Sequence, residues 1–148
     1  MRNEKGFTLI ELLAVIVILG ILMFVAIPMV TRYINNSRKD TFVDNAKMAL
    51  NQAKTEHASC DVDSTDSECA NWTTSGDCEE INLSKIQFEK PLKSPFDGTP
   101  ITGKIKVCTT TSGGTTTTEW SFQGAGTDGK GFPSYTAEDS LTRANVTA

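Results

Sequence analysis

One acidic residue, Glu11, lies inside an otherwise uncharged apolar run that covers residues 7–30. A carboxylate inside such a run costs about 2.5–3.5 kcal/mol to place in a membrane, so it usually has a function and a partner of opposite charge. The nearest positive groups are Lys5 and an amine that cleavage before Phe7 would create. The alternative is that Glu11, near one end of the run, reaches the lipid headgroups by itself. Charge alone leaves both possibilities open.

The four cysteines form the second group with possible chemistry: Cys60, Cys69, Cys78 and Cys108. They contain no CxxC pair, so a zinc site with the neighbouring His57 is the less favoured interpretation. Disulfide bonds formed after export suit a polar domain with little core, because each would stabilise it by about 2–4 kcal/mol. We favour Cys60–Cys69, which closes a loop at a helix end, and Cys78–Cys108, which ties that loop to a sheet.

Catalytic and cofactor-binding patterns are not evident in the remaining residues. An acidic cluster could offer oxygen ligands to calcium, but it lacks the glycine and spacing of an EF-hand, and a solvated loop is preferred; its members are Asp61, Asp63, Asp66 and Glu68. His57 is the only histidine and has no nucleophile beside it. No phosphate-binding glycine motif occurs. We therefore expect neither an enzyme nor a bound cofactor.

The composition divides the chain into an apolar end and a polar remainder. The chain has 148 residues, which suits one domain, and its net charge of −4 gives no hint of a nucleic-acid partner. The run of residues 7–30 exceeds the ~20 residues that cross a bilayer. It is too long for a signal peptide, whose apolar region is about 7–15 residues. A plain membrane anchor is not excluded by hydropathy.

The order of residue types at the start of this run is specific. It reads Lys5-Gly6-Phe7-Thr8-Leu9-Ile10-Glu11, followed by an unbroken apolar stretch. This segment resembles the processing site of type IV pilins and the related pseudopilins. The resemblance implies that a leader of residues 1–6 stays on the cytoplasmic side, and that a prepilin peptidase cuts between Gly6 and Phe7 and methylates the new amine. It also implies that Glu11 meets the Phe7 amine of a neighbouring subunit during assembly.

The function implied by this resemblance is a structural subunit of a type IV pilus, a self-polymer whose partners include the peptidase and the pilus assembly platform. The subunit would be a single-pass protein of the cytoplasmic membrane before assembly and part of an extracellular filament afterwards. Lys and Arg flank both ends of the run and do not decide its orientation, but the cysteines favour an oxidising location for the C-terminal part. The alternatives are a pseudopilin of a type II secretion system, a competence pilin, or a membrane-anchored extracellular binding module.

Helical character is predicted to continue past the apolar run, giving one helix over residues 7–58 with a transmembrane part at 7–30. An amphipathic stripe with spacings of three and four supports this prediction: Ile34, Arg38, Phe42, Ala46, Ala49, Leu50 and Ala53. Pro28 removes a backbone donor, so we expect a kink there. Gly20 weakens the helix by about 1 kcal/mol relative to alanine. The resemblance implies that residues 20–28 lose helical order in a filament.

Residues 59–148 are predicted to form a β-rich head on the amphipathic half of the helix, an α+β, pilin-like fold. Residues 104–110 and 119–123 alternate polar and apolar side chains, and Ser112-Gly113-Gly114 suits a hairpin turn between them. We expect loops at 59–80 and 91–103, and an irregular glycine-rich segment at 124–133. The threonines at 115–118 favour a solvated hairpin end.

Overall fold

The computed structural model describes residues 6–63, 65 and 67–148. The chain divides into two units, Met1–Asn36 and Ser37–Ala148, which we call the N-terminal unit and the head. The leader residues before Gly6 and the Asp66 of the acidic cluster lie outside the described part. One α-helix, α1 (Leu9–Val62), supplies the ordered structure of the N-terminal unit and the first element of the head. It ends beyond the predicted residue 58.

Within the head, α1 is amphipathic, as its sequence stripe predicts. Its buried positions fall at spacings of three and four: Phe42, Val43, Ala46, Ala49, Leu50 and Ala53. Several are alanines, which bring a sheet close to the helix backbone, while Phe42 fills the space between aromatic rings. The centroid of its ring lies 6.1 Å from that of Phe96 and 5.9 Å from that of Phe132. This stripe is the helical side of a single hydrophobic core.

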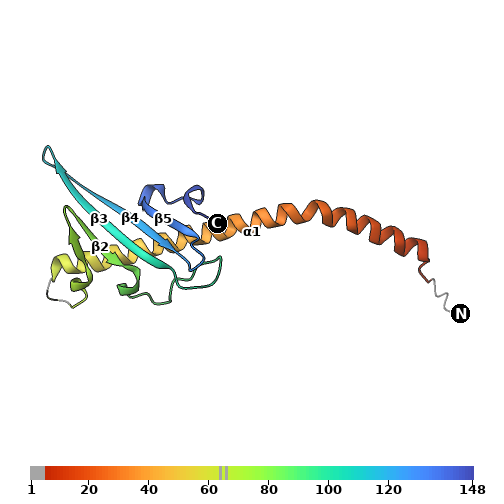
Figure 1. Cartoon of the computed structure of the whole chain (residues 1–148), viewed down its shortest axis with the longest axis horizontal. Coiled ribbons are helices and arrows are strands. Elements are labelled where there is room, and N and C mark those ends of the chain that lie inside the picture. Colours follow the sequence, from red (N-terminus) through yellow and green to blue (C-terminus); the bar gives the residue numbers. More distant parts are fainter. Residues whose placement is uncertain (1–5, 64, 66) are drawn as a thin grey trace. The chain divides into compact units, whose positions relative to one another are not determined.

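The other side of the core is a five-stranded antiparallel sheet with the order β1-β2-β3-β4-β5, which lies along this half of α1 (Figure 1). Its strands are β1 (Thr73–Ser75), β2 (Cys78–Asn82), β3 (Thr102–Ser112), β4 (Thr115–Ala125) and β5 (Gly131–Ala137). Ile81, Ile105 and Phe122 lie opposite one another in register and are buried. The α+β prediction is confirmed.

The β3–β4 hairpin follows its sequence pattern, and two other predictions about the head are wrong. Gly113 and Gly114 take φ values of 59° and 82°, the positive range that a tight two-residue hairpin turn needs. The predicted loop at 59–80 contains β1 and the start of β2, with a short 3₁₀ helix at Cys69–Asn71. The segment 124–133, predicted to be irregular, contains the end of β4 and the start of β5.

The C-terminal segment closes the head by contacts with α1. Arg143 Nε donates to Asp40 Oδ1 at 2.7 Å, and Lys54 Nζ lies 2.6 Å from Glu138 Oε2. Leu141 and Val146 are buried in the same core. Residues more than eighty positions apart in the sequence therefore hold the last segment against the helix.

Candidate processing and assembly site

The predicted cleavage residues, Gly6 and Phe7, precede α1 and are exposed. The Phe7 side chain is 88% exposed. A Cβ added to Gly6 would meet nothing within 4 Å. The chain itself therefore imposes no need for glycine at this position, and a requirement for a small residue would have to come from an enzyme that approaches the backbone.

Glu11 takes part in a hydrogen-bonded cap at the start of α1. The Thr8 backbone N–H donates to Glu11 Oε2 at 3.0 Å, and the Thr8 hydroxyl donates to the same oxygen at 2.9 Å. The Glu11 N–H lies 3.3 Å from Thr8 Oγ1. This is a capping box, in which threonine at the N-cap and glutamate three residues later satisfy each other's free N–H groups.

The capping role of Thr8 is absent from the sequence predictions, although the pattern was available. Thr8-Leu9-Ile10-Glu11 matches the T-x-x-E signature that precedes an apolar helix. The cap has a consequence for Glu11, because both donors from Thr8 converge on one carboxylate oxygen. An ionised carboxylate accepts at both oxygens, so Glu11 can serve the helix cap and still receive a cation. Glu11 lies four residues after Phe7, where cleavage would create the amine.

The apolar residues that follow Glu11 are exposed. None of the most apolar part of α1 is buried. By length and composition this part of the helix could cross a membrane. Side chains such as Phe24, which is 83% exposed, need a lipid or protein environment, because exposed apolar patches of this extent are rare on soluble monomers.

Gly20 and Pro28, the two predicted weak points, both lie within α1, which is helical through them. A Cβ on Gly20 would meet nothing within 4 Å. Next to Pro28, the Thr31 hydroxyl donates to the carbonyl of Ile27 at 3.1 Å. The loss of helical order over residues 20–28 in a filament stays a prediction.

In the head, the cysteines join as Cys60–Cys69 and Cys78–Cys108, the pairs that the sequence favours. The first bond closes the segment after α1, and the second links facing residues of β2 and β3. His57 lies beside the first bond, with Nε2 2.7 Å from Glu79 Oε2 and Nδ1 3.6 Å from Asp61 Oδ2. Its two nitrogens thus point to separate carboxylates. No cluster of metal-ligating side chains occurs among the described residues.

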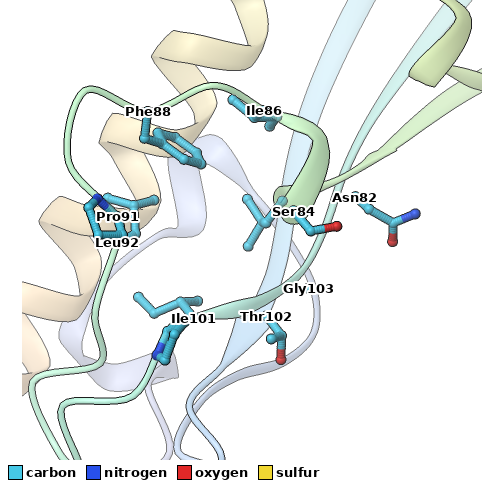
Figure 2. A pocket seen from close by; sticks show the side chains of 11 residues that line it. Asn82, Ser84, Ile86, Phe88, Pro91, Leu92, Ile101, Thr102 and Gly103 are labelled. Carbon is cyan, nitrogen blue, oxygen red and sulfur yellow. The ribbon is translucent and has the colours of Figure 1, made fainter.

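The head also has a cavity of about 430 Å³ between the start of β3 and the segment that follows β2. Figure 2 shows apolar side chains on its walls, among them Ile86, Phe88 and Leu92, with Asn82, Ser84 and Thr102 as its polar groups. None of the lining residues carries a charge or titrates near neutral pH. The cavity therefore offers shape and apolar surface, and its side chains supply no acid or base.

Comparisons with known proteins point to the same end of the chain. Residues 1–27 match the family model described as the prokaryotic N-terminal methylation motif. The chain is similar to the type IV major fimbrial protein FimA of Dichelobacter nodosus, with 39% identity over 49% of this chain and 45% of that protein. It is also similar to fimbrial protein Q of Moraxella bovis, with 32% identity over 60% of each chain.

The chain therefore spans about half of the first relative's length and somewhat more of the second's. No solved structure matches the chain. The match to the methylation motif covers Gly6, Phe7 and Glu11, and the structure adds a long apolar helix that leads into a small antiparallel sheet. Together with the two fimbrial relatives, these findings support a type IV pilin family for this chain.

Proposed function

We propose that this chain is a structural subunit of a type IV pilus. In this proposal a prepilin peptidase removes residues 1–6 and methylates Phe7, and the apolar part of α1 holds the subunit in the cytoplasmic membrane. The assembly platform then transfers it into an extracellular filament. The apolar half-helices form the interior of that filament, and the heads face outward.

The observation that carries the proposal is the placement of Glu11, a carboxylate in the first turn of an exposed apolar helix. A membrane anchor would gain only the helix cap from this charge, against the cost of placing a carboxylate in an apolar span. A filament does gain, because a buried carboxylate is strongly stabilised by an amine when no water competes. Both relatives bear names of fimbrial proteins, which favours a pilus over the pseudopilus, competence-pilus and tethered-module alternatives.

The test is Glu11→Leu, compared with Glu11→Gln and Thr8→Ala in cells that assemble the filament. Glu11→Leu should be cleaved normally, because the cut lies upstream, and should insert at least as well as the wild type. Assembly should fail, because the neighbour's amine would be buried without a partner at a cost of about 3–5 kcal/mol. The measurement compares the subunit in sheared filaments with the subunit left in the membrane.

The two further variants separate charge from helix capping. Glutamine keeps an oxygen that can accept from the Thr8 N–H, as in the S/T-x-x-E/Q form of the capping box, but it cannot neutralise an amine. Glu11→Gln should therefore fail to assemble, whereas Thr8→Ala, which loses a cap of about 1 kcal/mol and keeps the carboxylate, should assemble. Abundant Glu11→Leu or Glu11→Gln protein in the sheared fraction would refute the pairing role.

A further inference from the structure

Arg32 is the first charged residue after the apolar run of α1. Residues 12–31, which separate it from Glu11, carry no charge. At a rise of 1.5 Å per residue this stretch extends about 30 Å, which is the thickness of the hydrocarbon core of a bilayer. When these residues fill the hydrocarbon, the Arg32 side chain therefore lies at the boundary between lipid tails and headgroups.

The guanidinium of Arg32 has no ion pair or hydrogen bond with any residue in the described part of the chain. Its neighbours one helical turn away, Pro28 and Asn36, carry no charge. The adjacent Thr31 hydroxyl differs, because it donates to the carbonyl of Ile27 at 3.1 Å. Arg32 is thus a charged group at this boundary whose partner must come from outside the chain.

A hollow of about 290 Å³ adjoins the Arg32 side chain. Its other lining residues are Val25, Pro28 and Met29, which belong to the apolar run. Val25 precedes Arg32 by seven residues, or about 10 Å along the helix, so the apolar part of the hollow lies on the side of the lipid tails. Its cationic rim lies on the side of the headgroups. A phospholipid has the same order of parts, acyl chains and then an anionic phosphate.

We propose that Arg32 and this hollow bind a phospholipid in the outward-facing leaflet of the membrane. The guanidinium is planar and can donate two parallel hydrogen bonds to phosphate oxygens, while Val25 and Met29 contact the acyl chains. The site rests on the membrane stage of the proposed function, and it would hold the subunit at a fixed depth before assembly. Transfer into the filament would then have to release this lipid.

Two observations favour a phospholipid over other occupants. A second copy in the same orientation offers no free carboxylate near Arg32, because its nearest acidic residue, Asp40, lies eight positions further along the sequence and is paired with Arg143. The positive-inside rule places lysine and arginine mainly at the cytoplasmic end of a span. Insertion alone therefore does not account for a cation at the outward end.

Photo-cross-linking in vesicles tests the site with the full chain. The vesicles contain phosphatidylcholine and phosphatidylglycerol, one of which carries a diazirine in its acyl chain close to the glycerol. The phosphatidylglycerol probe should label residues 25–32 more strongly, because this headgroup has no cation of its own beside the phosphate. Arg32→Gln should lower that labelling about fivefold, which corresponds to the roughly 1 kcal/mol that one cation gains at an anionic membrane surface.

Three controls separate the parts of the site. Arg38→Gln is the matched variant, since Arg38 is the next arginine and is exposed but does not line the hollow; it should be labelled like the wild type. Val25→Trp keeps Arg32 and fills the hollow, so it should also lower the labelling. Excess inorganic phosphate should not compete, because it has no acyl chain to occupy the hollow.

The outcomes distinguish this site from the proposed function. Equal labelling of the wild type and Arg32→Gln in an inserted chain would overturn the lipid site and leave the pilus function intact. Competition by inorganic phosphate would also overturn it, in favour of a site for the free ion. A chain that does not insert into the vesicles would refute the site together with the membrane stage. Labelling that depends on Arg32, in a chain whose Glu11→Leu variant still forms filaments, would support the lipid site and refute the pairing role of Glu11.

Discussion

The apolar residues are buried in the head and exposed in the N-terminal unit. In the head, the stripe from Phe42 to Ala53 is buried against the sheet, and two disulfides and several ion pairs hold the polar segments around it. In the N-terminal unit, side chains from Leu9 to Val30 are exposed along the helix. The head therefore has a core of its own, whereas the apolar side chains of the N-terminal unit are not buried within the described part of the chain.

Blocking cleavage should have the largest effect and should act on the N-terminal unit alone. Gly6→Leu should accumulate as uncut precursor and form no filaments, because a large side chain would obstruct a protease at the backbone. Open space around Gly6 means that the chain itself should tolerate the change. Blotting for the precursor measures this outcome. Gly20→Ala, at another glycine with open space, should be cleaved like the wild type, and normal maturation of Gly6→Leu would contradict the processing site.

Removing an aromatic ring should affect the stability of the head only when the ring belongs to the head. Phe42→Ala should lower the free energy of unfolding of the head by about 3–5 kcal/mol, because it leaves a cavity in a close-packed core. Phe24→Ala, in the exposed apolar part of α1, should leave head unfolding unchanged. Thermal unfolding of the full chain in detergent, followed by near-ultraviolet circular dichroism, compares them. Equal shifts for both variants would show that the units do not differ as described.

A smaller effect should be a loss of stability of the head at acidic pH. Desolvation alone would raise the pKa of Asp97, but hydrogen bonds from Thr99, Thr127 and the Asp128 N–H outweigh it and hold that pKa well below its usual value. A carboxyl group whose pKa is lowered by folding stabilises the head above its unfolded pKa of about 4, and this contribution fades as pH falls below that value.

The measurement for Asp97 is the melting temperature of the head between neutral and acidic pH. Asp97→Asn cannot titrate and leaves the donors of Thr127 and Asp128 without their carboxylate oxygen. The variant should melt at a lower temperature than the wild type at neutral pH, and the gap should narrow in acid. A gap that stays constant with pH would contradict the role of the Asp97 charge.

The long helix and the central hairpin could be predicted because their signals are local. The three-and-four spacing of α1 and the alternation in β3 and β4 are properties of each segment alone. β1 and β5 have no such local signal and are strands because they pair with β2 and β4 in the sheet. β5 contains Pro133 and starts at Gly131, which both weaken a strand signal, yet a proline is tolerated there because β5 is an edge strand.

The candidate site and the contacts of the head differ in the same way: some residues have a local sequence signal and others do not. Gly6, Phe7 and Glu11 could be selected because a motif brings them together in sequence, and the Thr8 cap could have been selected from the same residues. The pair Asp40–Arg143 could not, since 103 positions separate its members and nothing local to either residue indicates the contact.

The order of elements also sets the order of events when the chain is made. The helical stripe that centres the core is synthesised early, but β4, β5 and the segment with Leu141 and Val146 come last. Contacts between such distant parts of a chain form slowly, because a long loop must close first. If the N-terminal run enters the membrane as it leaves the ribosome, the head remains incomplete at the membrane, because its core still lacks the C-terminal residues. Until the last residues have crossed the membrane, the β-rich segments lack their partners. They are then most prone to mispairing.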